Sequence, residues 1–202
     1  TILTGKHAHI HGKIDNIFPF DTANVTFPQI FQENGYQTAM FGKLHFGNNP
    51  EGMDEFMILP GQGDYYNPDF ITRAGDTAIE GYVTDIITDL TIDWLENRRE
   101  EEKPFLLFYL HKAPHREWLP APRHYKDFTK RIFPEPPTLF DDYEGRGTAA
   151  REAEMNLLKY MTVSADNKIY PEMAGELGVE EMSEWGFRVF KSKYERFTPE
   201  QK

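Results

Sequence analysis

Two short clusters of basic and proton-exchanging side chains each follow an apolar segment of the sequence. One cluster is Lys43 and His45, and the other is His111, Lys112 and His115. A lysine ammonium carries three hydrogen-bond donors on a point charge, which suits a tetrahedral oxyanion, and a histidine can donate or accept a proton near neutral pH. Brought into one pocket, these residues would form an anion site with titratable partners. That is the chemistry that a sulfate or phosphate ester requires.

The elements around the two clusters are typical of an α/β fold. Residues 27–34 (FPQIFQEN) predict a short helix capped by Thr26, and residues 36–41 (YQTAMF) predict a strand. A second helix begins at Thr84 with its apolar residues on one face, and residues 105–110 (FLLFYL) predict a strand buried on both faces of a parallel sheet. Helix, strand and loop follow one another twice, which favours a mainly parallel sheet.

Parallel strands explain why the two clusters should meet. In open parallel sheets, ligands bind beyond the carboxyl ends of the strands, and both clusters stand at such ends. Gly42 and Gly47 flank the first cluster and would let the backbone approach a ligand closely. The alternative is that each residue is a solvated loop side chain, and that His111 is a core histidine hydrogen-bonded to the backbone.

Composition restricts the class of partner. The 202 residues carry a formal net charge of −11, which argues against general binding to nucleic acid or to an anionic membrane surface. No run approaches the roughly 18 consecutive apolar residues of a membrane span. The chain has no cysteine, so it has neither disulfides nor thiol chemistry, and the compartment stays undecided on this ground.

The two ends of the chain are expected to differ in organisation. Residues 1–120 are expected to be part of a catalytic α/β domain, although residues 50–77 show little periodicity and are predicted to be irregular. Prolines cluster after residue 120, and a helix is predicted over residues 148–161. We therefore expect residues 121–202 to form an insertion, or a continuation of the same domain, made of loops and helices.

Three segments resemble signatures of one enzyme family. TILTGK at residues 1–6 is similar to the end of the type I sulfatase signature C-x-P-S-R-x-x-x-L-T-G-K/R. GYQTAMFGKLHFG (35–47) resembles the second sulfatase signature, and HKAPHREWLP (111–120) resembles a segment of many bacterial members. The run PEPPTLFDDYEGRGTAAREAEMNLL is similar to the N-acetylglucosamine-6-O-sulfatase branch. Leu44 and Phe41 depart from the usual residues of the second signature.

The resemblance implies an alkaline-phosphatase-like α/β sandwich that hydrolyses a sulfate ester of a glycosaminoglycan amino sugar, 6-O-sulfo-N-acetylglucosamine. It implies that Lys43 binds sulfate oxygens, and that His45 hydrogen-bonds the hydrated formylglycine nucleophile and helps to release sulfate. His115 would be a sulfate ligand and the general acid for the leaving oxygen. Lys6 would support the nucleophile loop, and would count among the substrate-binding residues.

The signature also implies groups outside these residues. Counting back along it places the formylglycine precursor six positions before Thr1, and the ligands of the family's calcium ion also fall outside the chain, so no metal ligand is assigned here. On this interpretation the chain is an internal fragment that is inactive by itself, from a periplasmic or secreted bacterial enzyme. Its partner would be a sulfated carbohydrate; the oligomeric state is not predicted.

Other interpretations stay open. The same residues would suit a phosphodiester or phosphonate monoester hydrolase of the same superfamily, or a non-catalytic module that binds sulfated glycans. His7, His9 and His11 alternate and could chelate a transition metal from one side of an extended segment. The acidic residues of DDYEGR (141–146) could contact a sugar or cap a helix. Trp118 could stack on a sugar ring or pack against the insertion.

Overall fold

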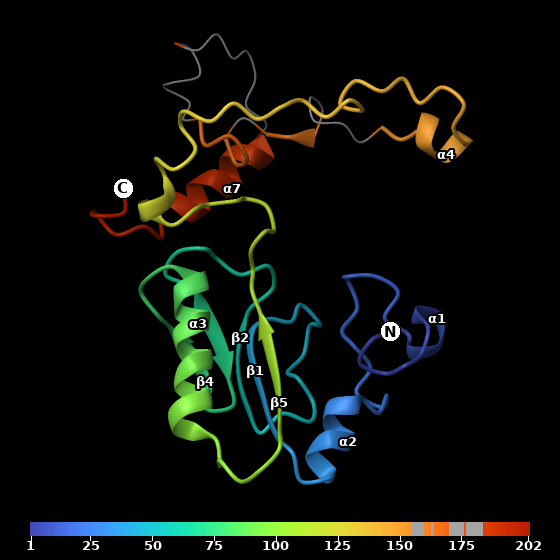
Figure 1. Ribbon diagram of the computed structural model, residues 1–202, viewed down its shortest axis with the longest axis vertical. Coiled ribbons are helices and arrows are strands. Elements are labelled where there is room, and N and C mark those ends of the chain that lie inside the picture. The colour runs from blue at the N-terminus through green and yellow to red at the C-terminus, as the bar shows by residue number, and fades with distance from the viewer. Residues whose placement is uncertain (155–159, 163, 170–175, 177–183) are drawn as a thin grey trace. The chain divides into compact units, whose positions relative to one another are not determined.

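The computed structural model describes residues 1–154, 160–162, 164–169, 176 and 184–202 (Figure 1). The chain forms two compact units, Thr1–His115 and Arg116–Lys202, and each is described by itself. No helix among the described residues is both long enough and apolar enough to cross a membrane.

The first unit is built on a five-stranded mixed sheet in the order β4-β3-β2-β1-β5. The strands are β1 (Gln37–Lys43), β2 (Glu55–Leu59), β3 (Asp69–Thr72), β4 (Gly75–Ala78) and β5 (Phe105–Leu110). β1 pairs in parallel with both β2 and β5, whereas β3 and β4 extend the sheet in antiparallel pairs beyond β2. The parallel part of the sheet is therefore its β2-β1-β5 side.

The expectation that residues 50–77 are irregular is wrong, because β2, β3 and most of β4 lie in this range. Each has only four or five residues, too few to show a clear period in the sequence. Pairing with β1 fixes β2, where Met40 lies opposite Phe56, and both side chains enter one buried cluster with Met53 and Ile58. Strand formation here depends on the neighbouring strand and on burial more than on local pattern.

The first predicted helix is present as α2 (Phe27–Glu33). Thr26 stands at its N-cap, where its backbone N–H donates to Gln29 Oε1 at 2.8 Å, as in a capping box. The ring of Phe27 lies 5.7 Å from that of Phe108 in β5, so α2 covers this face of the sheet.

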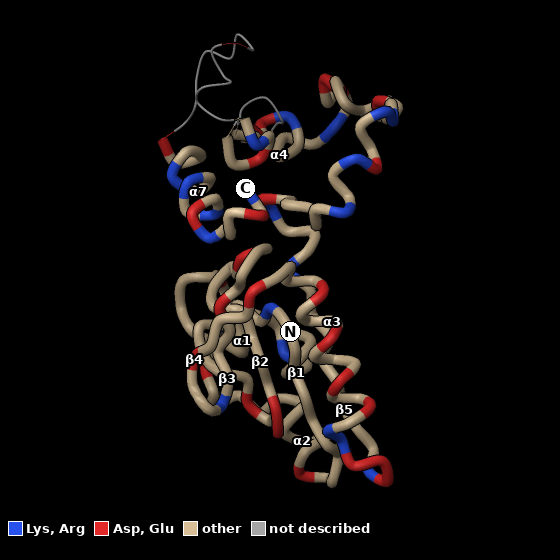
Figure 2. Tube along the Cα trace, turned by 90° about the vertical axis from the view of Figure 1, so that its left-hand side faces the viewer, with Lys and Arg blue, Asp and Glu red and all other residues tan. Residues whose placement is uncertain are grey.

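The second predicted helix is α3 (Val83–Asp93), which continues as a single π turn, η1 (Trp94–Arg98). Ile87 and Trp94 are buried, and the Trp94 ring meets the edge of Phe41 from β1 at 6.4 Å. In Figure 1, α2 and α3 lie on opposite sides of the sheet, and the acidic positions along α3 are red in Figure 2. The apolar face predicted for this helix is thus the one that packs on β1.

β5 is an edge strand and is not buried on both faces as expected. Among the described residues it pairs only with β1, and Phe105 and Tyr109 are each 43% exposed. An unbroken apolar run predicts a strand whose two faces can both be covered. It does not predict how many strands pair with it, because strand pairing depends on residues distant in the sequence.

The second unit has little regular structure among its described residues. It contains η2 (Pro122–His124), α4 (Thr148–Arg151) and α7 (Glu184–Tyr194). The prediction of one continuous helix over residues 148–161 is wrong, because α4 ends at Arg151 and residues 152–154 are not helical; residues 155–159 lie outside the described residues. Gly147 stands at the N-cap of α4, so the acidic residues of DDYEGR do not cap this helix.

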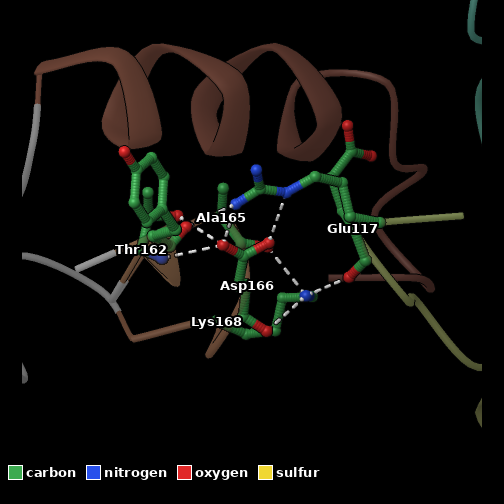
Figure 3. A network of polar contacts seen from close by, with 7 residues as sticks. Glu117, Thr162, Ala165, Asp166 and Lys168 are labelled. Atoms are coloured by element: carbon green, nitrogen blue, oxygen red, sulfur yellow. Dashed lines mark hydrogen bonds and ion pairs between the residues drawn. The ribbon is translucent and has the colours of Figure 1, made fainter. Parts of the chain in front are cut away.

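A polar network organises the start of the second unit (Figure 3). The carboxylate of Asp166 is fully buried and accepts hydrogen bonds from Arg116 Nε at 3.0 Å and from Arg116 Nη2. The N–H of Thr162 donates to the same carboxylate at 2.7 Å. Lys168 Nζ donates to the carbonyl oxygens of Glu117 and of Ala165. These bonds tie residues about fifty positions apart, 116–117 and 162–168, to one another.

Candidate functional site

The carboxyl ends of β2, β1 and β5 lie at one edge of the sheet because the three strands are parallel (Figure 1). Lys43 is the last residue of β1, and His45 follows it by two positions. His115 lies in the segment after β5, and Gln62 lies in the loop after β2. The parallel order thus places both sequence clusters at the edge where the sequence led us to expect a site.

Gln62 contacts both Lys43 and His45 of the first cluster. Its Oε1 accepts a hydrogen bond from Lys43 Nζ, and its Nε2 lies 3.3 Å from His45 Nδ1. His45 itself has a φ of 56°, in the left-handed region that residues other than glycine rarely adopt. Such backbone conformations are found preferentially at functional sites, where the surrounding contacts hold them.

The electrostatic surroundings of His45 are positive. Burial lowers the pKa of the His45 imidazole, and the charges of Lys43, Lys13 and His115 lower it further. Burial also lowers the pKa of the Lys43 ammonium. His115 of the second cluster is thus among the groups whose charge acts on His45. The site therefore gathers positive charge around an imidazole that stays neutral to lower pH than usual.

The second cluster is bonded to the loop after β2, which carries Gln62 and Tyr65. The hydroxyl of Tyr65 donates to the backbone oxygen of His115 at 2.6 Å. Lys112 is 2% exposed, donates from Nζ to the backbone oxygen of Gln62 at 3.1 Å, and stands 4.7 Å from the centre of the Tyr65 ring. His115 is exposed, so its side chain is open to solvent and to a ligand.

His111 does not share these contacts. Adjacent residues of an extended chain point to opposite faces, and His111 stacks edge-on against Tyr109 at 4.3 Å while Lys112 reaches Gln62. Burial lowers the pKa of His111, and its Nδ1 is buried without a hydrogen-bond partner among the described residues. It is half-buried against the sheet, and it is not the backbone-bonded core histidine considered as the alternative.

Lys6 lies apart from Lys43, His45 and His115 among the contacts of the described residues. Its Nζ donates to Asn24 Oδ1 at 3.3 Å, and its own surface is exposed. A role in supporting a nucleophile loop stays a prediction.

Trp118 and the alternating histidines are also placed by the structure. Trp118 is 45% exposed and belongs to the second unit, so stacking on a sugar stays a prediction. The rings of His7 and His9 stack at 5.8 Å, whereas His11 is buried and its Nε2 lies 3.0 Å from the amino group of Thr1. The three histidines are thus split between two environments and do not converge on one point.

Gly42 serves the sheet and not a ligand. Its φ is 118°, and a Cβ added there would stand 1.7 Å from the backbone oxygen of Leu110 in β5. Close approach of two strands therefore requires glycine at this position. Gly47 was expected to face a ligand as well. A Cβ added there would lie 3.2 Å from Pro19 Cα, so this glycine packs closely against the backbone at Pro19.

The structure adds three residues that the sequence patterns did not single out: Gln62, Tyr65 and Lys13. The first two lie in the segment PGQGDYY, whose glycines indicate a loop and nothing about chemistry. Their importance follows from contacts with residues 17 to 50 positions away. Lys13 follows the short helix α1 (Ala8–His11) and is recognised only through its effect on the pKa of His45.

The described residues offer no place for a metal ion, since they contain no group of three or more His, Cys, Asp or Glu side chains that could hold one. A hollow of about 240 Å³ borders His45 between Phe46 and Pro60. The second unit has a larger cavity of about 330 Å³, with walls from Tyr125, Phe190 and other residues of that unit.

Comparisons with known proteins identify relatives of this chain. The sulfatase family model matches residues 1–162. The chain is 52% identical over 171 residues to an N-acetylglucosamine-6-O-sulfatase of Bacteroides thetaiotaomicron, a match that covers 83% of this chain and 30% of that protein. It is 26% identical to the human N-acetylglucosamine-6-sulfatase, covering 66% of this chain and 29% of that protein. The chain thus spans about a third of the length of these relatives.

Solved structures extend the likeness to the fold. The structure of BT4656 in complex with its substrate D-glucosamine-2-N,6-O-disulfate matches with a TM-score of 0.85 at 46% identity, over 98% of this chain and 39% of that one. The structure of Ps i-CgsB in complex with k-i-k-neocarrahexaose matches with a TM-score of 0.58 at 19% identity, over 65% of this chain and 37% of that one, and supports the fold alone. The alkaline-phosphatase-like fold, with a mixed sheet whose core is parallel, is confirmed as a partial domain. This chain belongs to the sulfatase family.

Proposed function

We propose that this chain forms part of a sulfuric ester hydrolase that removes sulfate from a glycosaminoglycan amino sugar, 6-O-sulfo-N-acetylglucosamine or a related 6-O-sulfated glucosamine. The substrate class is supported by N-acetylglucosamine sulfatases among its relatives and by the disulfated glucosamine named for BT4656. The activity belongs to the whole protein, of which this chain supplies one part of the site.

The observation that carries the proposal is that Lys43, His45 and His115 all follow the carboxyl ends of neighbouring parallel strands, and that the loop after β2 contacts each of them. Gln62 contacts the first two, and the charge of His115 acts on His45. A cationic group, a neutral imidazole and an exposed histidine at one edge suit a tetrahedral anionic ester, such as a sulfate monoester, better than a neutral ligand.

Each of the three residues has a chemical task in this proposal. Lys43 binds the non-bridging sulfate oxygens and neutralises charge that develops on them during cleavage. His115 donates a proton to the sugar oxygen as the S–O bond breaks, which makes the leaving alcohol neutral. His45, neutral in these surroundings, would hydrogen-bond the nucleophile through its Nε2 atom. Lys6 and Trp118 are proposed as further substrate-side residues, the second through stacking on the sugar.

Other groups are proposed to come from outside the described residues. The family's formylglycine supplies the nucleophile, and the precursor residue is expected six positions before Thr1. The described residues do not fit a calcium ion, so its ligands are proposed to lie elsewhere in the protein. We propose a periplasmic or secreted location and a sulfated carbohydrate as the partner.

The test uses the full-length protein that carries this chain. Purified enzyme is given 6-O-sulfo-N-acetylglucosamine and, separately, the matching 6-phosphate, and released sulfate and phosphate are measured by ion chromatography. We expect sulfate release, with a fall of at least about a hundredfold in Lys43→Ala and in His115→Ala. Lys103→Ala and His124→Ala are matched controls, because both residues are exposed and form ion pairs outside this site.

Three results would contradict the proposal. Preferential release of phosphate would favour a phosphoester hydrolase of the same superfamily. Tight binding of the sulfated sugar without any turnover would favour a glycan-binding module. Near wild-type turnover in both Lys43→Ala and His115→Ala would remove these residues from the site.

A further inference from the structure

The side chain of Gln62 contacts two different kinds of group, and this fixes its orientation. Lys43 can only donate hydrogen bonds, so the Gln62 atom that faces Lys43 Nζ must be the carbonyl oxygen Oε1. The amide nitrogen Nε2 then faces His45 Nδ1 at 3.3 Å, and it can only donate. His45 Nδ1 must therefore accept, and the proton of the neutral ring resides on Nε2.

The same contact opposes protonation of His45. A protonated imidazole donates from both nitrogens, so its Nδ1–H would point at the N–H of Gln62 and the hydrogen bond would be lost. The charged groups that face His45 act in the same direction: Lys43 from β1, Lys13 from the segment after α1, and His115 from the segment after β5. Among the described residues, no carboxylate acts on the His45 pKa.

The loop that carries Gln62 is fixed at its backbone. Lys112 Nζ donates to the Gln62 carbonyl oxygen, and the N–H of Gly63 donates to the Pro60 oxygen at 2.9 Å to close a turn. Further along, the N–H of Val83 donates to the Tyr65 oxygen at 2.8 Å, which fastens the loop to the start of α3. Gln62 thus projects an exposed side chain from an anchored backbone.

We propose that Gln62 is a positioning residue that holds His45 as the neutral Nε2–H tautomer and aligns it with Lys43. A His45 ring fixed in this form presents an N–H donor from Nε2. The effect of that donor on turnover rests on the proposed function. The tautomer itself is a property of the resting protein, and it can be measured whether or not the protein releases sulfate.

The test replaces Gln62 by an isosteric acid. In Gln62→Glu both carboxylate oxygens accept, so Lys43 keeps its partner while His45 Nδ1 must now donate. We expect the neutral His45 ring to change from the Nε2–H to the Nδ1–H tautomer, and its pKa to rise by about one unit. Long-range ¹H–¹⁵N NMR spectra of ¹⁵N-histidine-labelled full-length protein, assigned with His45→Gln, report both quantities.

Kinetics give a second readout. If turnover needs neutral His45, the acidic limb of kcat/KM in Gln62→Glu should move to higher pH by the same amount as the pKa measured by NMR. Gln62→Met, which keeps the length of the side chain without either hydrogen bond, should lower kcat about fivefold to tenfold and leave a mixture of tautomers. Gln37→Glu is the matched control: it makes the same change at the opposite end of β1, where the side-chain oxygen accepts from the N–H of Glu100 at 2.8 Å.

The outcomes separate this inference from the proposed function. An unchanged tautomer and an unchanged His45 pKa in Gln62→Glu would overturn the inference, even in an active sulfatase. A protein that shows the tautomer change but releases no sulfate from any 6-O-sulfated glucosamine would retain the inference and lose the function. Should Gln62→Glu fail to fold, an Nε2–H ring that persists unmixed in Gln62→Met would equally overturn the inference.

Discussion

The hydroxyl of Tyr65, in the loop after β2, donates a hydrogen bond of 2.6 Å to the backbone oxygen of His115, fifty positions later in the chain. Tyr65 is buried, and its ring packs against Tyr82 at 6.1 Å near the start of α3. His115 is exposed, and it follows β5, which lies at the edge of the sheet. The buried tyrosine therefore restrains the backbone of His115, the proposed general acid.

Removing this hydroxyl should lower the rate and leave the fold intact. Tyr65→Phe keeps the ring against Lys112 but loses a hydrogen bond worth about 1 kcal/mol, so we expect kcat for sulfate release to fall about fivefold with little change in KM. Steady-state kinetics with 6-O-sulfo-N-acetylglucosamine provide the measurement. Tyr36→Phe is the control, because the Tyr36 ring packs against Phe31 at the other end of β1. Equal rates in the two variants would show that the Tyr65 bond does not restrain His115.

A methyl group at Gly42 should separate β1 from β5. The added Cβ would lie 1.7 Å from the Leu110 oxygen, so we expect Gly42→Ala to cost more than about 3 kcal/mol in the free energy of unfolding, or to prevent folding. Gly75→Ala is a matched control, because Gly75 has a similar φ of 126° with no atom within 4 Å of an added Cβ. It should cost only the backbone strain, about 1–2 kcal/mol. Urea unfolding followed by circular dichroism gives both values, and equal losses would contradict the clash.

The Arg116–Asp166 pair should make stability depend on pH. Burial raises the pKa of the Asp166 carboxyl, but the hydrogen bonds from Arg116 and Thr162 outweigh it and hold the pKa below its usual value. A carboxyl with a depressed folded-state pKa stabilises the fold above its unfolded pKa of about 3.9, and this stabilisation is lost as pH falls through the folded pKa. Asp166→Asn should therefore be less stable by about 1–3 kcal/mol at pH 7 and should lose this difference below about pH 4.

Thermal melts of both proteins between pH 3 and 7 test this dependence. Asp127→Asn serves as the control, since Asp127 pairs with His124 where both side chains are 49% exposed, and such pairs contribute little. A constant difference between wild type and Asp166→Asn across the whole range would show that the charge of Asp166 is not what stabilises the second unit.

The main features of the first unit follow from short stretches of sequence. Thr26 and the residues after it predict α2 because a capping residue acts within a few positions. The 3.6-residue spacing of apolar residues predicts α3, and an apolar run predicts β5. Lys43, His45 and His115 could be singled out because each stands beyond the end of such a strand, and parallel strands end at one edge.

The remainder depends on contacts between distant residues. β2 and β3 contain too few residues to show a period, and they form because pairing and burial in the sheet stabilise them. The same holds for Gln62 and Tyr65, which are ordinary loop residues until the fold sets them against His45 and His115. His111 is the opposite case. It belongs to the sequence cluster, but its ring packs against Tyr109, because adjacent residues of an extended chain point to opposite faces.

The sequence by itself therefore determined the family, the α/β class and three candidate functional residues, since these depend on residue types at short, regular spacings. Only the tertiary structure decided which loop contacts Lys43, His45 and Lys112, and why Gly42 is a glycine. Hydrogen bonds and steric contacts act over a few ångströms in space, and the distance along the chain between two residues does not reveal whether the fold brings them that close.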